Sequence, residues 1–138
     1  MKTMQKRRTI YITEADMRRL RPLIDGMKNS RDDLRALQEE LENARAVPPK
    51  EIPADVITMN SKARLRDLDT DEEMIFTLVF PAQADVQQNK ISVLAPIGTA
   101  MLGQRVGDQF SWDVPAGTIR LRVEEVLYQP EAAGDFHL

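Results

Sequence analysis

The sequence predicts an α+β protein: an antiparallel helical hairpin, in the form of a short coiled coil, followed by a mostly antiparallel sheet domain with one short helix. Three observations support this class. Apolar residues recur at helical spacing in the first third of the chain, the pattern changes to strands after a proline-rich break, and a segment framed by Pro and Gly has the length of one helix. The expected divisions are residues 1–47, a linker at 48–54, and a sheet domain at 55–138.

A short strand and a helix come first. Residues 9–12 are rich in β-branched and aromatic side chains, which is typical of a strand. Thr13 and Asp16 have the spacing of a capping box, so a helix is expected over residues 14–27. Pro22 lies inside this helix and should kink it or move its start.

A second helix is expected over residues 31–46. Its apolar residues repeat at steps of 3, 4 and 3, as do those of the first helix, and two such seams joined by a short connection favour an antiparallel hairpin. The alternative is that both helices lie flat on the rest of the protein. The seam residues are Met17, Leu20, Ile24, Met27, Leu34, Leu37, Leu41 and Ala44.

Strand patterns dominate after residue 54, and we expect four to six strands. Residues 74–80 are the most apolar run and are expected to form the central strand, whereas residues 81–90 form a polar loop and residues 129–138 an irregular tail. The remaining strands are expected within residues 55–68, 91–94, 110–114 and 118–128.

The short helix is expected directly after residue 95. Pro96 suits the first helical position, where its missing N–H is not needed. Gly103 stands where a left-handed residue ends a helix, and Gly107 with Asp108 signals a second turn.

Composition excludes most catalytic chemistry. The 138 residues include no cysteine and a single histidine, His137, next to the end of the sequence. A Ser-His-Asp site, a His/Cys metal cluster and a Gly-rich phosphate loop are therefore not expected. We expect no catalytic residues, no resident metal, no cofactor and no enzymatic activity.

Charge is distributed unevenly along the chain. Residues 1–31 carry a net charge of +6 and residues 32–138 carry −9, and an acidic body argues against direct DNA binding. The basic start is not followed by an apolar run of signal-peptide length, and no segment approaches the ~20 apolar residues that span a bilayer. We expect a cytoplasmic monomer with no membrane partner.

Three carboxylates gather at the expected tip of the hairpin: Asp25, Asp32 and Asp33. Such a group could hold Mg²⁺ if another protein supplied further ligands. The alternative is a structural role, because acidic residues in a first helical turn cap the helix and interact favourably with its dipole.

Residues 92–102, together with Gly107 and Asp108, resemble the C-terminal signature of the bacterial Gre transcript-cleavage factors. The order of hairpin, linker and sheet domain is also the Gre layout. Residues 55–62, 95–98, 105–108 and 128–135 are similar to one subfamily in particular, the regulators of nucleoside diphosphate kinase (Rnk).

The resemblance implies an FKBP-like C-terminal domain that docks on RNA polymerase beside the secondary channel, on the β′ subunit. The family's contact loop maps onto Ala95, Pro96, Ile97 and Gly98, and Ile97 is expected to be exposed. Ala95 departs from the Gre pattern, where Ser is usual. The polymerase-binding residues expected on this basis are Ser92, Ala95, Pro96, Ile97, Gly98 and Met101.

In the Gre factors a long hairpin carries tip carboxylates into the channel, where they help bind Mg²⁺. Here a helix of about fourteen residues gives an arm of roughly 20 Å, which would leave the tip short of the active centre. The resemblance therefore implies polymerase binding and competition with Gre-type factors, without transcript cleavage. The alternatives are a cleavage factor that acts through the tip carboxylates and an FKBP-like peptide-binding module or isomerase.

Overall fold

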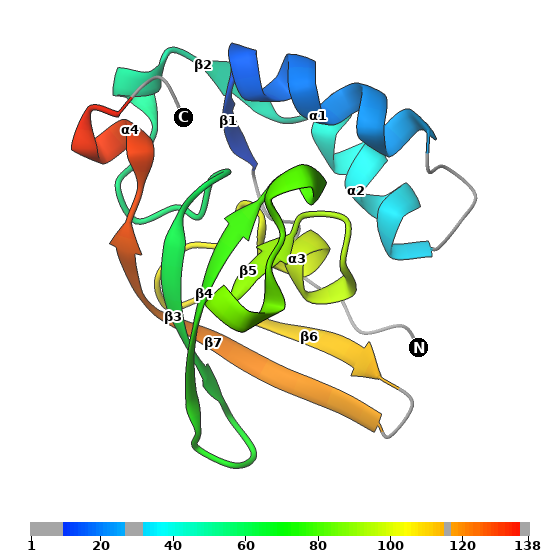
Figure 1. Cartoon of the computed structure of the whole chain (residues 1–138), viewed down its shortest axis with the longest axis vertical. Helices are drawn as coiled ribbons and strands as arrows, with labels where there is room; N and C mark the ends of the chain where they lie inside the picture. Colours follow the sequence, from blue (N-terminus) through cyan, green and yellow to red (C-terminus); the bar gives the residue numbers. More distant parts are fainter. Residues whose placement is uncertain (1–9, 27–31, 115–116, 136–138) are drawn as a thin grey trace.

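The computed structural model describes residues 10–26, 32–114 and 117–135. It contains a helical unit at one end of a twisted sheet, with a further short helix between them (Figure 1). The strands are β1 (Tyr11–Thr13), β2 (Arg45–Val47), β3 (Lys62–Asp67), β4 (Glu73–Val79), β5 (Lys90–Ser92), β6 (Gln109–Val114) and β7 (Gly117–Tyr128). The α-helices are α1 (Glu14–Gly26), α2 (Asp32–Glu42), α3 (Pro96–Met101) and α4 (Pro130–Ala133), and the 3₁₀ turns are η1 (Pro49–Glu51), η2 (Pro81–Gln83) and η3 (Val86–Gln88).

The start of α1 follows the expected capping chemistry. The backbone N–H of Asp16 donates to the Thr13 hydroxyl at 3.1 Å, and this bond satisfies one of the donors left free at a helix N-terminus. The helix runs from Glu14 to Gly26 with Pro22 inside it, so the proline does not move the start.

The second helix is shorter than the sequence predicts, because residues 45–47 form a strand. The turn closes at Ala44, whose N–H donates to the carbonyl of Leu41. The N–H of Arg45 then donates to the carbonyl of Ile10 at 2.8 Å, and β2 continues parallel to β1. The expectation of a helix to residue 46 was wrong here because β1, more than thirty residues earlier, supplies the competing hydrogen bonds.

The two helices pair in antiparallel fashion. Asp25, near the end of α1, accepts a 2.8 Å hydrogen bond from Gln38, and Arg21 donates to the carbonyl of Leu41 further along α2. Residues 27–31, which join the helices, lie outside the described residues.

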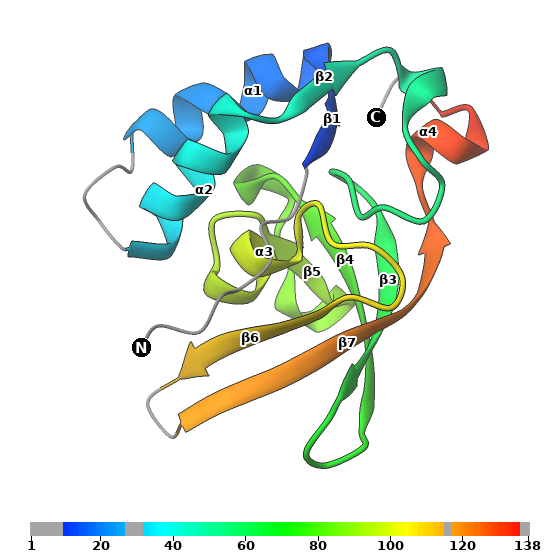
Figure 2. The ribbon, with the colours of Figure 1, turned by 180° about the vertical axis from the view of Figure 1, so that it is seen from behind.

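The hairpin also lies on the rest of the protein, as the alternative interpretation held. Its described seam residues belong to, or pack against, the same buried cluster as residues of the sheet and of α3, and α2 contacts α3 directly (Figures 1 and 2). On the α1 side, the guanidinium of Arg19 stacks 3.9 Å from the centre of the Phe80 ring. Buried contributors from both units are Leu20, Ile24, Leu34, Leu37, Leu41, Leu65, Leu78, Met101 and Leu121.

The main sheet has five strands in the order β5-β4-β3-β7-β6, and only the β4–β5 pair is parallel. This confirms the expected sheet of mostly antiparallel strands. The prediction that residues 74–80 form the central strand was wrong, because β3 occupies the middle and β4 lies beside the short edge strand β5. Ile75 in the first half of β4 is exposed, whereas Leu78 and Val79 at its end are buried.

The tail is partly helical, contrary to expectation. Pro130 occupies the first turn of α4, and Gly134 ends it in the left-handed conformation with φ of 82°. Glu131 of α4 is buried close to Asp16 of α1, so the end of the described chain lies against the helical unit. No described helix is long and apolar enough to cross a membrane.

Candidate docking site

The candidate docking segment begins where β5 ends. Ser92 organises the turn: its hydroxyl accepts the N–H of Leu94 at 3.0 Å, and its carbonyl accepts the N–H of Ala95 at 3.0 Å. This local turn redirects the chain from the sheet edge into α3.

Helix α3 starts as the sequence predicts. Ala95 is its N-cap and offers no side-chain oxygen, and Pro96 occupies the first turn. Thr99 compensates in part: its hydroxyl donates to the carbonyl of Val93 at 2.7 Å and ties the helix back to the turn. Gly103 follows with φ of 85°, which confirms the left-handed stop.

Gly98 sets how closely α3 approaches β5. A Cβ atom at this position would lie 2.0 Å from the carbonyl oxygen of Ser92, far inside van der Waals contact. Glycine has no Cβ atom and so permits this close approach, in which the backbone of α3 lies directly against the backbone of β5.

The expectation that Ile97 is exposed was wrong. Only 5% of Ile97 and none of Met101 reaches the solvent, because α3 turns these residues into the core that it shares with α2. The accessible part of the segment is its rim, where Pro96 is exposed and Ser92 and Ala95 are half-buried.

The three tip carboxylates are not brought together as one described group. Asp25 is exposed and bonded to Gln38, while Asp32 and Asp33 lie in the first turn of α2 with side chains outside the described residues. Among the side chains that the structure does describe, no group of three or more His, Cys, Asp or Glu residues is placed to hold a metal ion.

A buried pair of acidic residues lies where α1 meets α4. Burial and the nearby carboxylate of Glu131 raise the pKa of Asp16 to about 6. Glu131 accepts a 2.7 Å hydrogen bond from the Thr58 hydroxyl, which in turn pairs with Ser61. The sequence indicated the capping role of Asp16, but it carried no signal that Glu131, 115 positions later, would lie beside it.

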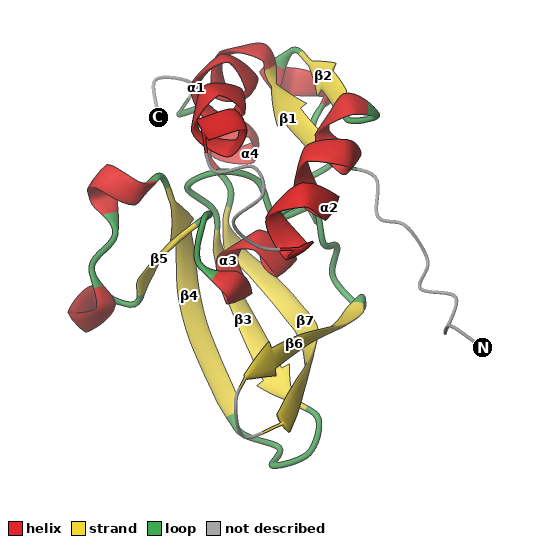
Figure 3. Cartoon of the chain, turned by 90° about the vertical axis from the view of Figure 1, so that its right-hand side faces the viewer, coloured by secondary structure: helices red, strands yellow, loops and turns green. Residues whose placement is uncertain are grey.

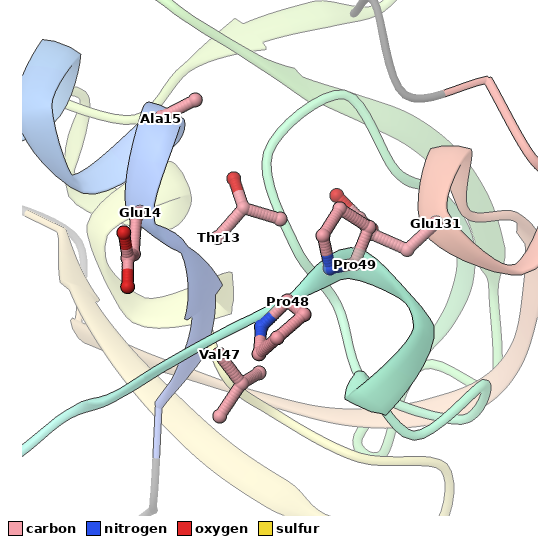
Figure 4. Close-up of a pocket in the computed structure, with 7 residues that line it drawn as sticks. All are labelled: Thr13, Glu14, Ala15, Val47, Pro48, Pro49 and Glu131. Atoms are coloured by element: carbon pink, nitrogen blue, oxygen red, sulfur yellow. The ribbon is translucent and has the colours of Figure 1, made fainter.

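A pocket of about 270 Å³ opens next to this pair (Figure 4). Its walls come from three separate stretches of chain: residues 13–15 where β1 meets α1, residues 47–49 at the end of β2, and Glu131 of α4. The pocket therefore lies at the junction of the helical unit with the tail, away from α3.

The outer face of the sheet carries arginines that are already paired. A hydrogen bond from Arg120 lowers the pKa of Asp69, and one from Arg122 lowers the pKa of Glu124. Cations bound to carboxylates on their own surface are poorly available to phosphates. The pairs within 3.0 Å are Arg64–Glu125, Arg66–Asp71, Arg66–Glu73, Arg120–Asp69 and Arg122–Glu124.

Comparison with known proteins agrees with this architecture. Residues 52–128 match the family model "Transcription elongation factor, GreA/GreB, C-term", and residues 8–47 match "Rnk N-terminus". The chain is 42% identical over 134 residues to the "Regulator of nucleoside diphosphate kinase" of Escherichia coli K12, which covers 96% of this chain and 98% of that protein. It is also 34% identical over 96 residues to the "Transcription elongation factor GreA" of Thermodesulfovibrio yellowstonii, covering 70% of this chain and 61% of that protein.

Solved structures show the same relationship. A GreA/GreB-type elongation factor from Nitrosomonas europaea superposes with a TM-score of 0.76 at 41% identity, covering 88% of this chain and all of that one. The similarity thus spans both the helical unit and the sheet, and it agrees with the family models in their order along the sequence. The chain belongs to the GreA/GreB family of transcription elongation factors and has an Rnk-type N-terminal region.

Proposed function

We propose that this chain is a non-enzymatic regulator that binds bacterial RNA polymerase beside the secondary channel, on the β′ subunit. It would act as a cytoplasmic monomer, without contacting DNA specifically, and would compete there with Gre-type factors. The support is the membership of the GreA/GreB family and the rigid turn that presents Pro96 at the rim of α3.

The short hairpin carries the second half of the proposal, which is binding without transcript cleavage. Helix α1 has 13 residues and α2 has 11, so the arm spans at most about 20 Å. Both helices also bury their apolar seams in the core shared with α3 and the sheet, which holds the arm against the body. Carboxylates at the tip of such an arm would not reach a distant active centre. Catalysis requires exact placement of these groups, so the protein would bind without stimulating cleavage.

A binding assay with core RNA polymerase tests the first half. We expect binding at micromolar concentration or below and displacement by an excess of a Gre factor. The variant Pro96→Lys should weaken binding at least about tenfold, since it places a charge on the exposed residue of the docking turn. Val106→Lys, on an exposed residue at a different turn, is the matched control and should bind as the unaltered protein does. Absence of binding by the unaltered chain would overturn the proposal.

A backtracked transcription complex tests the second half. Addition of the protein should release no short 3′ RNA, while it should slow the cleavage that an added Gre factor stimulates. Release of RNA by this protein alone would show that it is a cleavage factor instead.

A further inference from the structure

The edge of the sheet next to the docking turn is almost free of charge. Residues 81–96, which we call the uncharged edge, include only two charged residues, Asp85 and Lys90, in a protein with 30% charged residues. Most of residues 82–89 are exposed, so burial does not explain why Asp85 is the one charged residue among these eight. Depletion of charged residues on an accessible surface is typical of the centre of a protein–protein interface.

The uncharged edge stands out from the sheet at β5 and continues into the docking turn. Figure 3 shows the two turns between β4 and β5 beyond the edge of the sheet. Strand β5 contacts both η3 and α3. Strand β5 is the edge strand and pairs with β4, and on its other side Lys90 forms a β-bridge with Asp85 of the preceding turn. Strand β5 thus connects the exposed turn to the rim at Pro96 along the chain.

Val86 is the most exposed large apolar residue in the described part of the chain, with 80% of its surface accessible. Single exposed apolar residues are common and have no meaning alone. Val86 differs from such residues because hydrogen bonds fix the backbone both before and after it.

At least five hydrogen bonds hold this turn in place. Asp85 and Lys90 exchange two backbone hydrogen bonds of 2.9 Å, and the Asp85 carboxylate accepts the N–H of Gln87 at 3.1 Å. Asn89 adopts the left-handed conformation with φ of 58° and donates its N–H to the carbonyl of Val86. The carbonyl of Asn89 then accepts the N–H of Thr77 in β4 at 2.9 Å, which anchors the turn to the sheet.

We infer that the uncharged edge is the main polymerase-contacting surface of this chain and that Val86 is its anchor, fitting an apolar recess on an uncharged protein surface. This inference rests on the proposed function, and it moves the expected centre of the contact from α3 to the turn before β5. A rigid turn loses little conformational entropy on binding, so an apolar side chain fixed there contributes efficiently to affinity. The shortage of cations makes a nucleic acid an unsuitable occupant.

The test measures binding of core RNA polymerase to the full chain and to two matched variants. Val86→Asp should weaken binding at least about tenfold, as expected for an interface anchor. Val106→Asp makes the same substitution at another exposed valine, which lies at the turn before β6, and it should bind within about twofold of the unaltered protein. Both should keep the thermal midpoint of the unaltered protein, since both side chains reach the solvent.

Each outcome is decisive. Binding by the unaltered chain with equal binding by Val86→Asp overturns the inference and leaves the proposed function intact. A failure of the unaltered chain to bind overturns the proposed function itself. Sedimentation of the same variants addresses a second copy as occupant: a self-association lost in Val86→Asp, with polymerase binding unchanged, also overturns the inference.

Salt dependence gives an independent readout. Contact through an uncharged surface predicts that the dissociation constant changes less than about threefold between 50 and 300 mM salt. A steep loss of affinity with salt would show that ionic contacts dominate, and it would contradict docking through this edge.

Discussion

Asp16 shows how one carboxyl group links the stability of the protein to pH. Its pKa in the folded protein is about 6, above the value of 3.8 for an unperturbed Asp, because it is buried beside Glu131. The folded state therefore favours the protonated form. The stability that this group contributes is complete below about pH 4 and is lost as the pH rises through 6.

Substitution Asp16→Asn should remove this dependence. The variant should gain up to about 3 kcal/mol in free energy of unfolding relative to the unaltered protein at pH 8, and nothing at pH 4. Urea titrations of both proteins at pH 4, 6 and 8 measure the difference. A difference that stays constant over this range would show that Asp16 has an ordinary pKa.

Gly98 has a purely geometric role, and its replacement tests the junction between α3 and β5. Gly98→Ala should destabilise the protein by at least about 3 kcal/mol, because the added methyl group meets the Ser92 carbonyl and either the helix or the strand must move. Gly26→Ala, at the end of α1, is the control: an added Cβ there meets nothing within 4 Å. Chemical denaturation of both variants checks this, and equal stabilities would contradict it.

At the scale of elements, the hairpin and the sheet are coupled through a shared core. Leu37 of α2 is fully buried in the cluster that includes α3 and the sheet. A protein built in this way should unfold as one unit, although its helical and sheet regions match different family models.

Leu37→Ala should therefore lower the free energy of unfolding by about 2–5 kcal/mol. The same loss should appear in helical circular dichroism and in the fluorescence of Trp112, which belongs to β6. Ala36→Ser, at an exposed neighbour on α2, should have little effect. Loss of the helical signal before the fluorescence change would show that the hairpin unfolds independently.

At the scale of the whole molecule, the sequence predicts features that depend on neighbouring residues. The Thr13–Asp16 cap, the start of α3 at Pro96 and the left-handed Gly103 were confirmed, because each follows from the conformational preferences of a few adjacent residues. The family motif in residues 92–108 is equally local.

Features that need distant partners escaped prediction. Strand β2 forms because β1 lies beside it, and Ile97 is buried because α2 lies near α3. Six residues of α3 are too few for a periodic pattern to show which face is covered. Residues 81–90 of the uncharged edge were predicted as a polar loop, but the sequence did not indicate the hydrogen bonds that hold its turn.

The parallel pairing of β1 with β2 has a consequence for how such proteins change over time. The two strands hold the ends of the helical hairpin side by side: β1 directly precedes α1, and two residues separate α2 from β2. Insertion or deletion of whole helical turns can lengthen or shorten the arm while the β1–β2 pair at its base stays unchanged. Arm length and attachment can therefore evolve separately, so that one scaffold can serve a series of factors that differ in reach.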